Sequence, residues 1–208
     1  MHPGPLNILL VALLPLSGLT AFAQKTSHPK GDFVEPATGV RFPEKLAGLD
    51  RTMVVDYESE KPGLGMGIKY EGPVKGWVAD LYLYSSGLPP GIPSLNDPGI
   101  LAHFEQVQAD LKTMEASGYY QNVKKLDSGV RTIGSGPHGL PALWAEYSYS
   151  ARDGISRRSH VILGICRGHY FKIRYTYPAS EKKAETSLPL LLRALSDSLK
   201  KPAPPAAI

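Results

Sequence analysis

The sequence has very little cysteine: among its 208 residues only Cys166 carries a thiol. One cysteine cannot form an internal disulfide, so the fold must be stabilised by packing. Common functional motifs are missing as well. There is no His-Glu-x-x-His zinc helix, no Gly-x-Ser-x-Gly nucleophile turn, no Walker loop and no calcium loop. These absences argue against the frequent enzyme classes, and we predict no metal and no cofactor. They do not exclude an unusual hydrolase.

Apolar runs are also scarce, and the clearest one lies at the start of the chain, from Ile8 to Leu14. A proline and a glycine follow it before an Ala-x-Ala sequence that ends at Ala23. This order is typical of a secretory signal peptide, although no Lys or Arg precedes the apolar run. A membrane anchor, the alternative, would need a longer and unbroken stretch. We therefore expect residues 1–23 to be a signal peptide and the protein to be periplasmic or secreted, with no membrane span after cleavage.

Positive charge is present but not concentrated. The formal net charge is +4, and the 23 Lys and Arg residues are scattered along the chain. Binding to nucleic acid would need these residues in a stripe or patch. We predict no nucleic-acid partner and expect an unknown protein or small molecule of the cell envelope instead.

The remaining residues predict one domain. Residues 24–36 are polar and predict a flexible leader, and the Pro/Ala-rich residues 201–208 predict a disordered tail. Residues 37–200 show neither an internal repeat nor a linker, and they are numerous enough to form a single core. The connection from Ser85 to Pro98 is long and rich in Pro, Gly and Ser, and some loops of this kind are functional lids.

Two helices are predicted by apolar spacing. Asp97 is a natural N-cap and Pro98 suits a first helical turn, while Gly118 marks the end. The apolar stripe between them consists of Ile100, Phe104, Val107, Leu111 and Met114. A last helix begins at Ser180 or, because Pro189 breaks a helix interior, at Ser187.

The stretch from Leu143 to Tyr177 predicts three strands joined by two tight turns. The first turn contains Asp153-Gly154, a strong hairpin signal, and the second contains Arg167-Gly168. In the third strand apolar residues alternate with Lys172 and other polar residues, the period of a half-buried strand.

Two-residue turns would fix the register of this meander. Tyr147, His160 and Tyr175 then share one row on the face that we assign to the core. The opposite face carries Trp144, Glu146, Lys172 and Arg174. A slip of one residue in either hairpin would exchange the faces of one strand.

The fold class predicted is α+β, with a sheet of about seven strands and two main helices in a sandwich-like arrangement. The sheet should be largely antiparallel because hairpins dominate its connections. The order of elements resembles that of the Mog1/PsbP-like (DcrB-like) α/β/α sandwich superfamily. The resemblance rests on the Val40-Arg-Phe-Pro43 strand, then the mid-chain helix, then the Phe171–Pro178 strand with its following helix. The resemblance covers residues 33–199. It implies a small exported domain that binds a partner or ligand, and it transfers no site residues.

Two clusters on the meander are candidates for ligand binding. His160 between Tyr147 and Tyr175 can bind a small ligand or act as a base, but such clusters are more often the hydrogen-bonded polar end of a core. Trp144 with Arg174 can hold an anion. The alternative, which we favour, is a solvated face with a Glu146–Arg174 ion pair.

Cys166 faces His169 across the second hairpin in the predicted register. A thiol beside an imidazole can form a nucleophile pair or half of a metal site. One Cys and one His do not complete a zinc site, however, and an isolated cysteine is usually a small buried hydrophobe.

We therefore predict an exported, non-enzymatic binding or accessory domain of unknown ligand or partner. One alternative is a small hydrolase-type enzyme that uses the His160 tyrosine cluster or the Cys166/His169 pair. Another is a structural protein of the cell envelope.

Overall fold

The computed structural model describes residues 25–89, 94–134 and 139–200, which form eleven strands and two helices. The helices are α1 (Pro98–Ala116) and α2 (Lys182–Lys200). The strands are β1 (Lys25–Ser27), β2 (Phe33–Val34), β3 (Arg41–Phe42), β4 (Lys45–Leu46), β5 (Leu49–Asp56), β6 (Met66–Glu71), β7 (Val78–Tyr84), β8 (Tyr120–Ile133), β9 (Leu140–Ala151), β10 (Ser156–Cys166) and β11 (His169–Pro178).

Nine strands form one sheet in the order β1-β5-β6-β7-β11-β10-β9-β8, with β4 paired to β5, and all pairs are antiparallel. Strands β2 and β3 form a separate ribbon. Strand β7, which closes the N-terminal meander, pairs with β11, which closes the C-terminal one. The antiparallel α+β prediction is thus confirmed, with more strands than expected.

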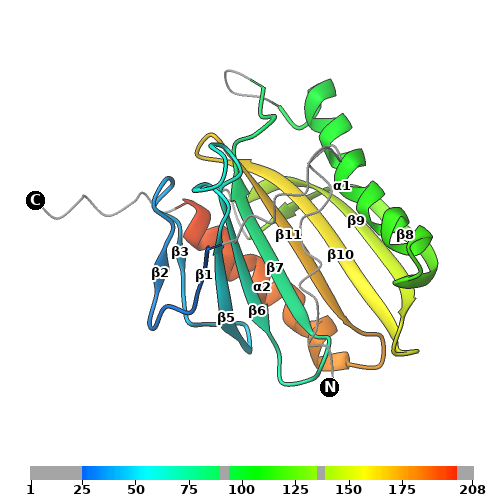
Figure 1. Cartoon of the computed structure of the whole chain (residues 1–208). Helices are drawn as coiled ribbons and strands as arrows, with labels where there is room; N and C mark the ends of the chain where they lie inside the picture. The colour runs from blue at the N-terminus through cyan, green and yellow to red at the C-terminus, as the bar shows by residue number, and fades with distance from the viewer. Residues whose placement is uncertain (1–24, 90–93, 135–138, 201–208) are drawn as a thin grey trace, which may run out of the picture.

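The two helices cover opposite faces of the sheet, so the fold is an α/β/α sandwich (Figure 1). We call these the α1 face and the α2 face. Because both are covered, residues 142–145 of β9 are all buried, although successive side chains point to opposite faces. Neither helix in the described part of the chain is long and apolar enough to cross a membrane.

Helix α1 begins and ends where the sequence predicts. The Asp97 carboxylate accepts a hydrogen bond from the Gly99 amide at 2.8 Å, and Pro98 occupies the first turn. Gly118 follows the helix with a φ of +70°, a conformation that favours glycine. The buried residues of the helix are Ile100, Phe104, Val107 and Leu111.

Replacing Asp97 with alanine is expected to lower the free energy of unfolding by about 1 kcal/mol, because the Gly99 amide loses its acceptor. Urea denaturation followed by circular dichroism measures the loss. Asn at the same position keeps an acceptor oxygen and serves as the control. Equal midpoints for the wild type and the alanine variant would contradict the assigned cap.

Helix α2 begins at Lys182, close to the first predicted start, and the alternative start at Ser187 is wrong. Pro189 lies inside the helix, where it removes the N–H that would bond to the Glu185 carbonyl. Leu191 and Leu195 are almost fully buried against the sheet beyond the proline. This packing stabilises the helix despite the missing hydrogen bond.

The β10–β11 hairpin has the predicted register. Arg167 and Gly168 both have positive φ, as the two central residues of a type I′ turn do. His160 therefore pairs with Tyr175, and Cys166 with His169.

The register predicted for β9–β10 is wrong by one residue. The loop has three residues, Arg152 to Gly154, and pairs Ser150 with Ser156. Gly154 has a φ of +75° in the last loop position, which is typical of a three-residue hairpin loop. The extra residue exchanges the two faces of β9 and moves Trp144 to the α2 face and Tyr147 to the α1 face.

The segment predicted as a flexible leader contributes two strands, β1 and β2, which pair with β5 and β3. The Arg51 guanidinium helps to fix this segment, because it donates to the carbonyls of Pro29 at 2.8 Å and Gly31 at 2.5 Å. The predicted signal peptide and the predicted C-terminal tail lie outside the described residues, as do residues 90–93 of the long connection.

Candidate functional site

The structure distributes the five predicted ligand-binding residues over both faces of the sheet. Trp144, His160 and Tyr175 lie on the α2 face, whereas Tyr147 and Arg174 lie on the α1 face. The predicted Tyr147–His160–Tyr175 row and the predicted Trp144–Arg174 strip therefore do not form. The cause is the one-residue difference in the β9–β10 loop.

His160 is enclosed by aromatic rings on the α2 face. Its ring centroid lies 4.7 Å from Trp144, 5.9 Å from Tyr177 and 6.4 Å from Tyr175. Nε2 lies 3.4 Å from the Tyr177 hydroxyl, and the buried Nδ1 has no hydrogen-bond partner among the described residues. Burial, and to a smaller extent the charges of Arg131 and Arg158, lower the pKa of His160 to about 4. The ring is therefore neutral at pH 7.

Tyr175 joins α2 to the sheet. Its hydroxyl accepts a hydrogen bond from Trp77 Nε1 at 2.6 Å and donates one to the Ala184 carbonyl at 2.7 Å. Burial raises the pKa of Tyr175, which keeps the hydroxyl protonated. Both of these bonds are internal, so Tyr175 acts here as a structural residue.

The thiol of Cys166 is also engaged in packing. It donates to the Leu199 carbonyl at 3.0 Å, and burial raises the pKa of Cys166. His169 instead directs Nδ1 to the Arg167 carbonyl at 3.0 Å. The two residues are paired in the register, but within the described residues no hydrogen bond joins thiol and imidazole, so they form no nucleophile–base pair.

A different group of side chains meets on the α1 face. Asp80 comes from β7, Lys172 and Arg174 from β11, and Asp110 from α1. Asp80 is buried and the other three are half-buried. We call these four residues the charged cluster. The sequence placed Lys172 and Arg174 on a solvated face, and the structure corrects this because α1 and several tyrosines cover that face.

Among the described residues, Lys172 has no ordinary polar partner. Its ammonium lies 4.4 Å from the centroid of the Tyr82 ring and 6.0 Å from that of Tyr84, which is the geometry of a cation–π contact. Within the part of the chain that the structure describes it makes no hydrogen bond and no ion pair. Burial lowers the pKa of Lys172 to about 8, opposed by the carboxylate of Asp110.

Arg174 binds tyrosine hydroxyls instead of the predicted Glu146. Its Nη2 donates to Tyr120 at 2.8 Å and to Tyr149 at 3.5 Å, and these two rings stack 4.1 Å apart. Glu146 pairs with Arg158 at 2.7 Å, so the predicted Glu146–Arg174 ion pair is wrong. Arg174 thus keeps its positive charge unpaired by any carboxylate among the described residues.

Asp80 has unused hydrogen-bonding capacity. It is 7% exposed, and its buried Oδ1 has no partner among the described residues. Burial raises the pKa of Asp80, and the charges of Lys69, Arg174 and Lys172 oppose that rise. A buried carboxylate oxygen without a partner is unusual in a folded protein.

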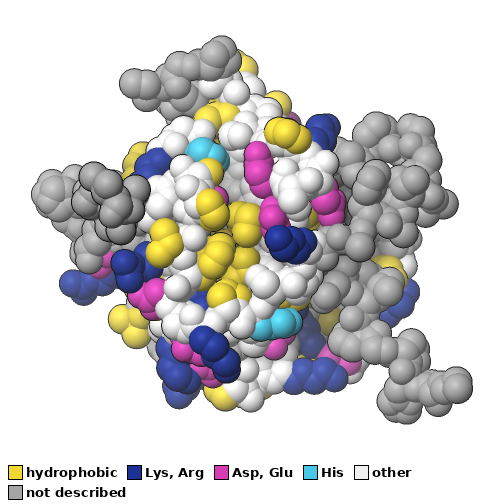
Figure 2. Space-filling model, turned by 60° about the vertical axis from the view of Figure 1, so that its left-hand side comes forward, with side chains coloured by type: hydrophobic (Ala, Val, Ile, Leu, Met, Phe, Trp, Pro, Cys, Tyr) yellow, Lys and Arg dark blue, Asp and Glu magenta, His cyan; other side chains and the backbone are white. Residues whose placement is uncertain are grey.

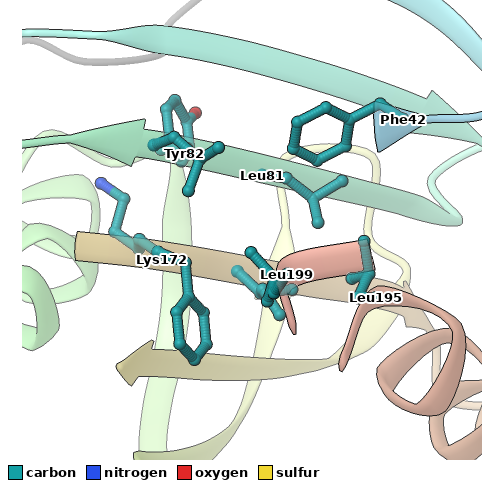
Figure 3. Close-up of a pocket in the computed structure, with 9 residues that line it drawn as sticks. Phe42, Leu81, Tyr82, Lys172, Leu195 and Leu199 are labelled. Carbon is teal, nitrogen blue, oxygen red and sulfur yellow. The ribbon is translucent and has the colours of Figure 1, made fainter. Parts of the chain in front are cut away.

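The cavity in Figure 3 lies between the sheet and the C-terminal end of α2. Lys172 lines it only with its stem, since its amino group points away from Leu195 and Leu199 (Figure 3). The cavity volume is about 10 Å³, near the smallest space that admits one water molecule. It is therefore a packing gap in an apolar layer.

Figure 2 shows one face of the molecule, on which Lys and Arg side chains lie among Asp and Glu around a hydrophobic centre. Over the described residues, no group of three or more His, Cys, Asp or Glu side chains is placed to hold a metal ion.

No family model and no curated protein sequence matches this chain. Among solved structures, it is similar to the solution structure of cyanobacterial PsbP (CyanoP) from Synechocystis sp. PCC 6803. The identity is 14% and the TM-score 0.41, over 90% of this chain and 95% of that chain. At this TM-score the match carries no argument about the family or the function of this chain.

Proposed function

We propose that this protein is an exported, non-enzymatic binding or accessory domain that binds through the charged cluster on the α1 face. One observation carries the site: Lys172 and Arg174 are half-buried cations with no carboxylate partner among the described residues. Charged groups that are already held in place by neighbouring rings lose little conformational freedom when they bind. Export rests on the signal-peptide pattern of residues 1–23.

The two enzyme alternatives lack the geometry that they need. Tyr147 lies on the opposite face from His160, and its hydroxyl donates to Gln108 at 2.7 Å. Cys166 is held as a neutral thiol, bonded to a backbone carbonyl. The third alternative is a structural envelope protein. Reversing the charge of Arg174 would leave the function of such a protein intact, whereas under our proposal the same change should abolish binding.

Native mass spectrometry of protein recovered from the periplasm of the exporting host tests the proposal. We expect the wild type to have the mass of a chain that begins at Gln24, together with a reproducible extra mass from a retained ligand. The Lys172→Met variant should lose the extra mass. Lys45→Met should keep it, because Lys45 is an exposed lysine outside the cluster that is paired with Asp50.

Three results would contradict parts of the proposal. A mass that still includes Met1 would contradict export. An extra mass that Lys172→Met retains would contradict the site. The absence of extra mass from all three proteins would contradict a retained ligand and favour a transient protein partner.

A further inference from the structure

Strand β8 forms one edge of the sheet, and its outer side is unpaired within the described part of the chain. It pairs with β9 alone, whereas β5, β6, β7, β11, β10 and β9 each have a neighbour on both sides. Residues 124–132 of β8 are exposed without interruption, so the helices bury neither face of the strand there. An edge strand of this kind presents a row of unpaired N–H and C=O groups that can pair with another strand.

The two halves of β8 differ in how well they can accept a further strand. The first half carries both irregularities of the β8–β9 ladder, between Gln121 and Lys124 and between Lys125 and Asp127. Bulges and lysines are features by which proteins protect their sheet edges from pairing. From Asp127 to Ile133 the ladder is regular. The regular second half is therefore the part of this edge that remains open.

The charges of the second half are complementary to themselves. Asp127 and Arg131 lie on the α2 face, where Arg131 is 4.1 Å from the centroid of the Trp144 ring. They are exposed, and they bond to each other at 2.6 Å across the position of Gly129. If a second copy of β8 pairs antiparallel about an axis at Gly129, Asp127 of each protomer lies opposite Arg131 of the partner subunit. Opposite charges then alternate around the axis.

Neighbouring registers lack this complementarity. An axis one residue earlier, at Ser128, would place Lys125 opposite Arg131 of the partner subunit. An axis at Asp127 would place two aspartates opposite each other. Like charges directly opposite each other destabilise a strand pair, so the charges of β8 favour the axis at Gly129.

The α1 face of the same half supplies apolar contact. Val130 pairs with Leu143, a residue of the α1 face, and is 59% exposed. With the axis at Gly129, Val130 lies opposite Ser128 of the partner subunit, and the two valines become diagonal neighbours. Pairing would thus remove exposed apolar surface from water while the backbone groups of the edge gain partners.

We propose that the second half of β8 is a homodimerisation surface, at which two copies of the chain join their sheets edge to edge about Gly129. The pair is closed, because each copy uses the same residues and leaves no further β8 edge. Pairing of β8 with the other sheet edge, β1, would involve only three residues of β1 and would continue from copy to copy without closing. This inference does not rest on the charged cluster, so either proposal can fail alone.

Sedimentation equilibrium of the purified protein over a range of concentrations tests the inference. We expect a reversible monomer–dimer equilibrium. Arg131→Asp and Asp127→Arg each place like charges opposite each other at two symmetric positions, so each should weaken the dimer at least about tenfold. The double variant, Asp127→Arg with Arg131→Asp, restores opposite charges within and between the chains, and its affinity should return to within about threefold of the wild type. Arg41→Asp breaks an exposed ion pair outside β8 and should leave the dimer unchanged.

Hydrogen exchange locates the interface. Backbone amides of residues 127–132 should exchange more slowly at concentrations at which the dimer predominates than in the monomer. A protein that stays monomeric up to about 1 mM overturns the inference. So does a dimer in which these amides exchange as fast as in the monomer, or a double variant that dimerises as weakly as the single variants. The native mass spectra of the Lys172→Met variant decide the proposed function separately.

Discussion

Replacing Tyr175 with phenylalanine is expected to lower the free energy of unfolding by about 3 kcal/mol, although the change removes a single oxygen. That oxygen accepts from Trp77 Nε1 and donates to the Ala184 carbonyl, and the phenylalanine ring can do neither. Trp77 is 1% exposed, so its N–H has no access to bulk water once the hydroxyl is gone. Unsatisfied buried groups of this kind cost far more than the net gain from one hydrogen bond.

Tyr147→Phe is the matched control for this experiment. Its hydroxyl makes one hydrogen bond, to the half-buried Gln108, so the expected loss is about 1 kcal/mol. Guanidinium denaturation followed by tryptophan fluorescence measures both variants. Equal small losses would show that Tyr175 does not join α2 to the sheet, and would reopen a binding role for its hydroxyl.

The second large effect is a loss of stability in acid that depends on His160. Its pKa is about 4 in the folded protein, below the ordinary value of 6.5, because the ring is buried. The unfolded chain therefore takes up a proton between these two values while the folded protein does not. Stability from this residue is fully present above pH 6.5 and is lost as the pH falls toward 4, by up to about 3 kcal/mol.

His160→Gln isolates this contribution. Glutamine does not titrate, so the difference in unfolding free energy between the two proteins should change across pH 6.5 to 4. The raised pKa values of Asp80 and Asp110 act in the opposite direction, but they are present in both proteins and cancel in the difference. Parallel stability curves over this range would contradict the lowered pKa of His160.

Local patterns predicted the elements well. The 97–118 helix, the alternation in β11 and the Arg167-Gly168 turn are each determined by residues close together in sequence, and all three are confirmed. The Asp153-Gly154 pair did not determine the length of its loop, because a two-residue turn and a three-residue loop can both place glycine at a positive φ. That single ambiguity reversed the faces of β9 and with them the predicted site.

The charged cluster was missed for a second physical reason. Alternation in β11 shows that Lys172 and Arg174 share a face, but not whether that face meets water or a helix. Asp80, a carboxylate in the otherwise apolar and aromatic strand β7, was the available signal. The position of Asp80 could point to the cluster only if the pairing of β7 with β11 was known. This contact between distant parts of the chain leaves no local pattern in the sequence.

The same contact has a consequence for how the chain acquires its fold. The centre of the sheet joins a strand from the first half of the sequence to the last strand before α2. Pairings between such distant segments form slowly, since a long loop must close first. A nascent chain cannot complete its central ladder until β11 has been synthesised. If the protein is exported as proposed, this topology leaves the central ladder unpaired until most of the chain has emerged from the ribosome.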